Sequence, residues 1–288
     1  MLKRLFLATV AALAVALLSI NLLVRYNKDF LIGRAEQRLG RKLSADQINI
    51  TFWPVGARLV NFALADDPDF STGDFLRAKE LRVELRVLPL FIGQVRPKRI
   101  TLDSPVITLV RDASGRYNFF SRGRDEEQSR ARGSSLTRPA RAPDRSISWI
   151  PASVISNGML RYRDLTGGEI TVTQIELHSS EFDLGEPSEI QLAAAVNADK
   201  PNLTIKSRIG AIGEHRDFRD VPLDGEINAT DLDLGKVNKA LPRLRKSLPS
   251  ALRFDGIYTI KELKFKGPLN NLSLKGAVTG TDASFRFD

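Results

Sequence analysis

The feature that most constrains the fold of this chain is an alternation of apolar and polar residues with a period of two. Leu81, Val83, Leu85 and Val87 alternate in this way with charged residues. A β-strand points successive side chains to opposite faces, so the alternation is typical of strands with one apolar and one polar face. The pattern returns in later segments: 100–102, 107–109, 170–177 with one slip, 190–196, 203–209, 263–265 and 272–274. The sequence therefore predicts a mainly β fold.

Dipeptides of the Asn-Gly and Asp-Gly type predict where these strands turn. Each of them separates two short apolar runs. They are Asn157-Gly158, Asp224-Gly225 and Asp255-Gly256. Both central residues of a type I′ hairpin turn need positive φ, which Asn, Asp and Gly tolerate. These signals favour an antiparallel meander.

An uncharged, mostly apolar run from Leu5 to Val24 precedes the β-rich part and has basic residues on both flanks. About 20 helical residues span the roughly 30 Å hydrocarbon core of a bilayer. A cleaved signal peptide, the alternative, usually has an apolar region of only about 7–15 residues. We therefore predict a short tail, residues 1–4, and a retained transmembrane anchor, residues 5–24. The basic residues on both flanks leave the orientation of the anchor open.

Two short helices are expected outside the anchor. Apolar residues at helical spacing between Asp29 and Leu39, followed by Gly40, predict an amphipathic helix that ends at the glycine. This helix either lies on a membrane surface, with its basic face towards anionic head groups, or packs on its own domain. A second helix is expected over 237–247, where Pro242 keeps it short or broken.

A highly charged segment, residues 121–146, divides the β-rich part. It is rich in Arg, Gly, Ser and Pro and has almost no apolar residues. Such a composition buries too little apolar surface to offset the entropy of ordering, so we expect a disordered linker. The linker separates a first β module, residues 25–120, from a second β section, residues 147–288.

The scarcity of helices raises the question of what covers the apolar face of the sheet. A sheet with one apolar face must pack it against helices or a second sheet. Because the expected helices are few, the sheet either closes on itself as a sandwich or curls into a groove that holds something else. Periodicity alone favours the sandwich and leaves the groove open.

The chemistry-bearing residues indicate no catalytic, metal or cofactor site. The chain has no cysteine, and neither of its histidines, His178 and His215, has a metal-binding spacing. The acidic pair Asp66-Asp67 is typical of a turn. The net charge of +9 is not gathered into a basic stripe with interleaved aromatic residues, so we do not expect nucleic-acid binding. The sequence predicts a protein that is not an enzyme.

A series of short motifs follows in a fixed order between Ile48 and Phe120. They read Phe52-Trp53-Pro54-Val55-Gly56, Asp66-Asp67-Pro68-Asp69-Phe70, Leu88-Pro89-Leu90 with Gly93, Ser104-Pro105-Val106-Ile107 and Gly115-Arg116-Tyr117-Asn118-Phe119. A further landmark, residues 154–164, comes after the charged segment. In order and spacing these motifs resemble the AsmA family, as does the N-terminal apolar run.

The resemblance implies an elongated, curled antiparallel sheet that forms a groove, and it favours the groove over the sandwich. It also implies a single-pass anchor in a bacterial inner membrane, with the bulk of the chain in the periplasm. The implied function is to bind or conduct phospholipid between the inner and outer membranes, which supports outer-membrane biogenesis. The partners would be phospholipids, the inner membrane and other envelope proteins. A tethered scaffold that assists outer-membrane assembly without carrying lipid is the alternative.

The groove hypothesis makes a prediction about individual residues. Acyl chains would lie along apolar side chains of the strands in the first module. The residues expected to line the groove are Leu81, Val83, Leu85, Val87, Ile107 and Leu109.

Overall fold

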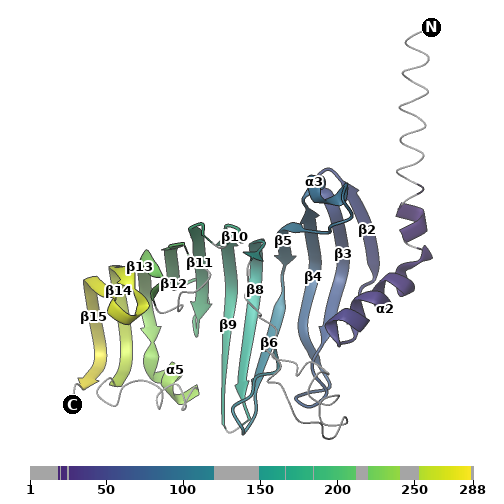
Figure 1. The fold of residues 1–288 in the computed structure, drawn as a ribbon. Coiled ribbons are helices and arrows are strands. Elements are labelled where there is room, and N and C mark those ends of the chain that lie inside the picture. The colour runs from purple at the N-terminus through teal and green to yellow at the C-terminus, as the bar shows by residue number, and fades with distance from the viewer. Residues whose placement is uncertain are drawn as a thin grey trace, which may run out of the picture.

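The computed structural model describes residues 19, 21–24, 26–119, 149–165, 167–183, 185–211, 220–240 and 253–286. These residues form one curled sheet of 13 strands with a few short helices, which confirms the mainly β prediction (Figure 1). Most of the predicted anchor, residues 5–24, and the whole charged segment, residues 121–146, lie outside the described residues. In the described part of the chain, no helix is both long and apolar enough to cross a bilayer.

The strands follow the chain order across the sheet, from β1 and β2 at one edge to β15 at the other. The strands of this sheet are β1 (Leu43–Ser44), β2 (Gln47–Phe52), β3 (Val55–Ala65), β4 (Asp74–Leu85), β5 (Pro97–Asp103), β6 (Val106–Arg111), β8 (Ala152–Asp164), β9 (Gly168–Ser179), β11 (Ser188–Val196), β12 (Leu203–Ile209), β13 (Pro222–Asp233), β14 (Arg253–Pro268) and β15 (Ser273–Arg286). A separate two-stranded sheet pairs β7 (Trp149–Ile150) with β10 (Phe182–Asp183).

The prediction of a purely antiparallel sheet is wrong at one joint. β8 runs parallel to both β5 and β6, with Arg99 opposite Ala152 and Val106 opposite Met159. Parallel neighbours need a crossover connection of about a dozen residues or more. The chain between β6 and β8, which includes the charged segment, is long enough for this crossover. The first module and the second section therefore contribute to one continuous sheet.

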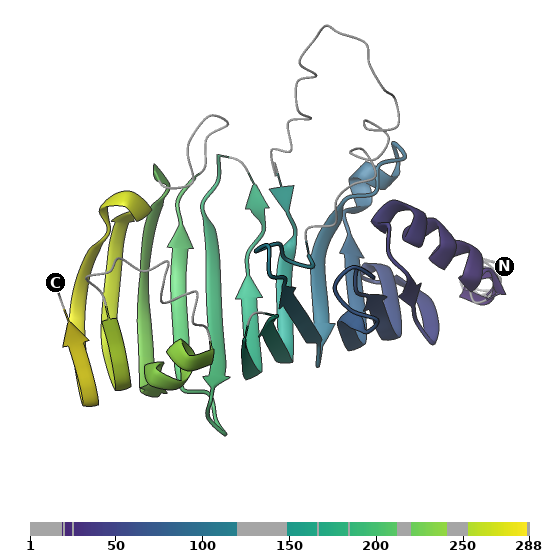
Figure 2. The same ribbon diagram turned by 90° about the horizontal axis from the view of Figure 1, so that it is seen from below.

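Backbone irregularities recur along the sheet, within strands or directly beside them. Eight non-glycine residues of the described chain have φ between 49° and 51°. They are Asn61, Ser104, Asn157, Gln174, Asn197, Asp231, Glu262 and Asp282. Irregular residues of this kind bend a strand and increase its twist. The strands look long both in Figure 1 and in the perpendicular view of Figure 2, so they bend along their length.

The bend keeps the apolar side chains on one face. On β8, a Cβ atom at Gly158 would lie 2.7 Å from Cγ2 of Ile155 and 3.2 Å from Cβ of Ile175, so these positions share a face. Residues 155 and 158 would point to opposite faces of a regular strand, but Asn157 lies between them with a φ of 51°. On β9, Gln174 has the same effect and explains the slip in the apolar alternation of 170–177.

The three predicted hairpin turns are wrong, because all three dipeptides lie inside strands. Asn157-Gly158 lies in β8, Asp224-Gly225 in β13 and Asp255-Gly256 in β14. Gly225 is needed for close packing, since a Cβ atom there would lie 2.3 Å from the carbonyl oxygen of Lys206 and 2.5 Å from the ring of Phe265. A glycine within a strand marks such an approach or a bulge as readily as it marks a turn.

The helices lie beside the first strands (α2), at the upper end of the sheet (α3) and at its lower end (α5) (Figure 1). The predicted helix after the anchor is confirmed as α2 (Lys28–Leu39), which ends at Gly40 with a φ of 68° and a hydrogen bond of 2.8 Å from its N–H to the Glu36 carbonyl oxygen. The second predicted helix begins earlier, as α5 (Leu234–Ala240), and residues 241–250 lie outside the described chain. A four-residue helix, α3 (Val87–Leu90), and a 3₁₀ turn, Leu269–Asn271, complete the elements.

One cluster of buried hydrophobic residues lies under α5. Val196, Ala229 and Leu232 form its centre, and Leu234 and Val237 of α5 pack against it. α5 thus covers the lower end of the second section, at the apolar face of the sheet. How far the rest of the apolar face is exposed depends on which side chains the other strands place there.

Candidate functional site

Cross-strand pairing aligns aliphatic side chains from ten strands into a single row, which we term the apolar row. Every member is Leu or Ile, and each lies opposite the next across the sheet. The members are Ile48, Leu59, Leu81, Leu102, Ile155, Leu177, Leu192, Ile205, Ile227 and Leu263. Strand pairing therefore joins the first module and the second section into one continuous aliphatic strip.

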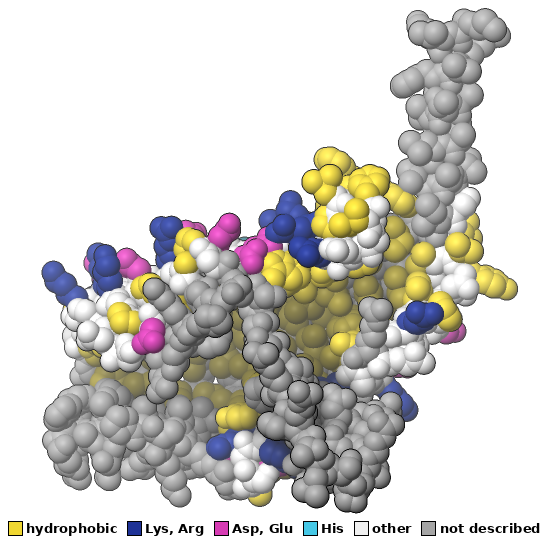
Figure 3. All heavy atoms as spheres, in the orientation of Figure 1, with side chains coloured by type: hydrophobic (Ala, Val, Ile, Leu, Met, Phe, Trp, Pro, Cys, Tyr) yellow, Lys and Arg dark blue, Asp and Glu magenta, His cyan; other side chains and the backbone are white. Residues whose placement is uncertain are grey.

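The apolar row lines the hollow of the sheet but is not sealed. Of its ten members only Ile48 is buried, at 8% exposure, and the other nine are half-buried. Figure 3 shows hydrophobic side chains lining the hollowed face, with Lys and Arg side chains gathered along its upper rim. A row of this composition inside a closed core would be fully buried, so the half-buried state agrees with an open groove and not with a sandwich.

Of the six residues expected to line the groove, five lie in strands β4 and β6 and one, Val87, does not. Leu81, Val83 and Leu85 share one face of β4, and Ile107 and Leu109 share one face of β6; all five are half-buried. Ile107 pairs with Leu76 on β4. Val87 does not continue the strand: it begins α3 and its side chain is 46% exposed.

The rows beside the apolar row differ between the two parts of the sheet. In the first module the next row towards the upper end is formed by Ile50, Ala57, Val83 and Ile100. In the second section the same row continues as Ser153, Ser179, Ile190, Ser207, Gly225 and Phe265. The apolar lining of the groove is therefore wider near β2, in the first module, than in the second section.

The outer face of the same strands is charged. Glu80 lies between Arg58 and Arg82, with a nitrogen–oxygen distance of 2.5 Å to each. Burial opposes ionisation of Glu80, but the hydrogen bonds from Arg58 and Arg82 outweigh this effect and hold the pKa of its carboxyl below the ordinary value of 4.5. The two faces of β4 therefore have opposite chemistry.

A pocket of about 720 Å³ lies at the upper end of the groove, beneath α3. Its apolar lining comes from the β2–β3 turn, from the end of β4 and from α3: Trp53, Val55, Leu85, Val87, Leu88 and Pro89. Its charged lining includes Glu181, which accepts hydrogen bonds from Arg86 and from the indole nitrogen of Trp149. The volume lies within the range of roughly 300–1,000 Å³ typical of small-molecule sites.

A buried polar cluster, which we term the latch, lies at the lower end of the first module. The Asn118 side chain donates to the Asp66 carboxylate at 2.9 Å and to the Thr108 carbonyl oxygen at 2.9 Å, and accepts from the Val110 N–H at 2.9 Å. The Arg41 guanidinium donates to the Asn118 carbonyl oxygen and lies 4.0 Å from Asp66. Asn118 has no exposed surface, and the Asp66 side chain has none either.

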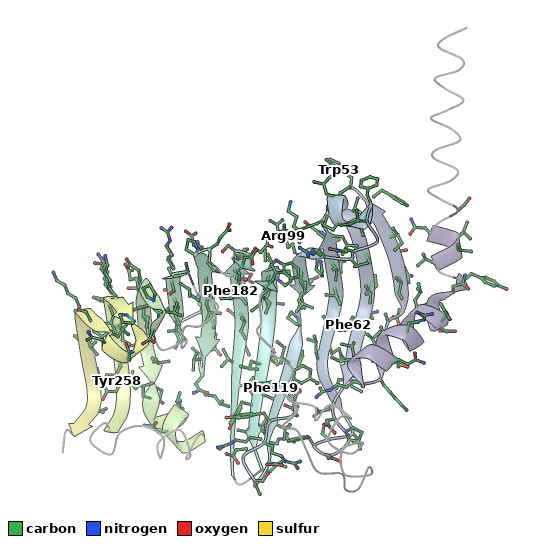
Figure 4. All side chains as sticks on the ribbon, viewed as in Figure 1. Trp53, Phe62, Arg99, Phe119, Phe182 and Tyr258 are labelled. Atoms are coloured by element: carbon green, nitrogen blue, oxygen red, sulfur yellow. The ribbon has the colours of Figure 1, made fainter. Side chains whose placement is uncertain are left out.

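The latch explains two of the motifs found in the sequence. Asp66 begins the turn between β3 and β4, where it accepts from the Asp67 N–H at 2.8 Å and the Ser71 hydroxyl at 2.7 Å. Asn118 ends the turn that follows β6, and Phe119 next to it lies at the lower end of the sheet in Figure 4. The turn-forming role predicted for the acidic pair is therefore confirmed, but the part of Arg41 was not visible in the sequence.

The histidine that the structure describes lies outside the groove. His178 is exposed on β9, opposite Val154 on β8, and His215 lies outside the described residues. Across the described ranges, no group of three or more His, Asp or Glu side chains is placed to hold a metal ion.

Comparison with known proteins gives one positive result. A model described as the AsmA family matches residues 2–250 of this chain, which covers the anchor run, the latch, α3 and most of the apolar row. A search of curated proteins finds no matching protein.

Proposed function

Because this chain belongs to the AsmA family, we propose that it is a membrane-anchored envelope protein whose groove binds or conducts phospholipid between the inner and outer membranes. In this role it supports outer-membrane biogenesis. The observation that most strongly supports the proposal is the apolar row, a continuous strip of Leu and Ile across ten strands in which only Ile48 is buried.

The chemistry of the row suits acyl chains. Transfer of each buried CH₂ group from water to an apolar surface is worth about 0.8 kcal/mol, so a chain lying on the row gains several kcal/mol. Neighbouring strands lie about 4.8 Å apart, so a row across ten strands is roughly 43 Å long. The chains of one bilayer leaflet span only about 15 Å, half of the hydrocarbon core. The row is therefore long enough for lipid to lie along it.

The anchor belongs to the same proposal. The apolar run ends with Asn21–Val24 in helical conformation, and the Asn21 side chain is hydrogen-bonded to both the N–H and the carbonyl oxygen of Ile50, at 2.7 Å and 3.2 Å. The end of the run is thus joined to the first long strand of the groove. In our proposal the run is a single-pass anchor in the inner membrane, the sheet lies in the periplasm, and the protein binds lipid without catalysing a reaction or using a cofactor.

The test is to identify lipid bound to the purified full chain. The protein is extracted in a mild detergent, washed, and its bound phospholipid is measured by mass spectrometry. We expect phospholipid in the wild type and about a tenfold reduction in the double variant Val83→Asp/Leu102→Asp, because an acyl chain cannot lie on a carboxylate without a large desolvation cost. The matched control is Gln191→Asp/Thr204→Asp, which puts the same charges at exposed positions of the outer face.

Folding of the groove variant decides between the alternatives. In an open groove the new carboxylates are hydrated, so the circular dichroism spectrum and the unfolding midpoint stay close to those of the control. A folded wild type without phospholipid favours the tethered scaffold. A groove variant that unfolds while the control does not would indicate a closed core and contradict the groove.

A further inference from the structure

The upper end of the first module carries a cluster of exposed large apolar side chains, which we term the apolar tip. Its members come from the β2–β3 turn and from the segment between β4 and β5. They are Trp53 (95% exposed), Val87 (46%), Leu88 (80%), Phe91 (81%), Ile92 (72%) and Val95 (69%). Figure 3 shows hydrophobic side chains gathered at this corner of the molecule, and Figure 4 shows Trp53 beyond the ends of the strands.

The backbone of the tip makes several hydrogen bonds within its own segment. The N–H groups of Phe91, Ile92 and Gly93 donate to carbonyl oxygens of α3 at 3.2, 3.2 and 3.0 Å. The Arg86 N–H donates to the Arg96 carbonyl oxygen at 2.9 Å, which closes the segment at its base. These bonds hold the apolar side chains outward, so their exposure results from a defined conformation. Exposed apolar patches of this kind mark surfaces that another phase or molecule covers.

The charged residues around the tip are mainly basic. Arg86 is paired with Glu181, and Arg99 lies 3.8 Å from Glu84. Arg96 and Lys98 are exposed and have no ion-pair partner among the described residues. Figure 3 shows Lys and Arg side chains beside the apolar tip, and Figure 4 shows Arg99 at the same rim. The surface at the tip thus combines aromatic and aliphatic side chains with an excess of positive charge.

The end of the predicted anchor lies at the same end of the sheet. Asn21 is hydrogen-bonded to Ile50, which precedes Trp53 by three residues on β2 and the following turn. Leu22 and Leu23 are exposed beside it, at 69% and 65%. Any bilayer that holds the apolar run is therefore close to the tip.

From these observations we infer that the apolar tip docks on the surface of an anionic phospholipid bilayer. Trp and Phe insert at the level of the head groups, where their rings are favoured, and Arg96 and Lys98 meet the negative charge of the lipid. The pocket beneath α3 shares Trp53, Val87 and Leu88 with the tip, so docking would bring the mouth of the groove against the bilayer. The docking itself does not require that the groove carries lipid.

The absence of cysteine from the chain allows a direct test. The variant Phe91→Cys is labelled with an environment-sensitive fluorophore in the full chain, which is reconstituted into vesicles of phosphatidylcholine and phosphatidylglycerol in equal parts. Leu165→Cys, an exposed apolar position at the lower end of β8, is the matched control. We expect the F91C label to be quenched by an aqueous quencher at least about fivefold more slowly than the L165C label, as for a side chain in the interface.

Two further measurements make the inference specific. Adding Arg96→Glu and Lys98→Glu is expected to remove most of the protection in these vesicles, whereas Lys206→Glu and Arg208→Glu, exposed on the outer face of β12, leave it unchanged. A photo-crosslinker on F91C is expected to form adducts with phospholipid. Equal quenching of the two labels, or adducts with a second copy of the chain in place of lipid, overturns the inference.

The same samples separate this inference from the proposed function. Lipid held in the groove is measured by mass spectrometry of the F91C protein, and docking is measured by quenching of its label. Loss of protection in the Arg96→Glu/Lys98→Glu variant with normal bound lipid would leave both conclusions standing. An F91C protein without bound lipid but with a protected label would contradict the groove proposal alone.

Discussion

The two ends of the first module differ in the kind of side chain that they bury and expose. At the lower end, the latch buries Asp66, Asn118 and most of Arg41, all polar, within hydrogen-bonding contact of one another. At the upper end, the apolar tip exposes Trp53 and Phe91 almost completely. Both ends include residues of the motifs quoted from the sequence, Asp66 and Asn118 at the lower end and Trp53 at the upper end.

The difference indicates which end is structural and which is functional. Buried polar groups are costly unless they are paired, and in the latch they are all paired, so the lower end stabilises the fold. Exposed apolar groups are costly in water unless something covers them, and the side chains of the tip add little to the core because they are largely exposed. Stability should therefore depend on the latch, and membrane contact on the tip.

The largest expected effect is at the latch. Asn118→Ala removes the three side-chain hydrogen bonds to Asp66, Thr108 and the Val110 N–H and leaves these buried partners unpaired. We expect the free energy of unfolding to fall by about 2–4 kcal/mol, measured by urea denaturation of the full chain in detergent. Asn270→Ala, which removes one exposed hydrogen bond to Asp220, is the control and should cost less than about 1 kcal/mol. Equal losses of unfolding free energy in the two variants would contradict the structural role of the latch.

A smaller effect is expected on the outer face between the two ends. Glu80→Gln removes the ion pairs with Arg58 and Arg82, which are half exposed, so the loss at neutral pH should be at most about 1 kcal/mol. Because the folded-state pKa of Glu80 is lowered, its stabilisation is present above the ordinary pKa of 4.5 and is lost as the pH falls through the folded value. The difference between wild type and variant should therefore disappear in acid and shrink in high salt. If the difference in the free energy of unfolding between wild type and variant grew in acid, the pKa of Glu80 would be raised in the folded protein and not lowered.

The smallest expected effect on stability is at the tip. Leu88→Asn and Phe91→Asn replace side chains that are 80% and 81% exposed, so the free energy of unfolding should change by no more than about 0.5 kcal/mol. The same variants should abolish the protection of a label at Val95→Cys in anionic vesicles. If either variant destabilises the protein as much as Asn118→Ala does, the tip is a packed part of the fold and the contrast between the two ends is wrong.

The sequence by itself determined the features that depend on near neighbours along the chain. The period of two identified the strands, and the helical spacing with Gly40 identified α2 and its end. Five of the six predicted groove residues share the apolar faces of β4 and β6, since alternation within a strand decides which face a side chain takes. Even the slip in 170–177 was visible, and its cause, the positive φ of Gln174, lies within the same strand.

Only the tertiary structure decided what depends on residues distant in the chain. Gly225 was mistaken for a turn because the ring that fills the space of its missing side chain belongs to Phe265, on the next strand. The parallel joint of β8 with β5 and β6 depends on the path of a long connection, which leaves no periodic pattern. The latch joins Arg41 to Asn118, and the apolar row becomes a single strip only through the register of ten strands. Local pattern gives each strand its apolar face. Strand register combines those faces into an open groove, and only the tertiary structure decides the register, because it is set by pairing between segments distant in the chain.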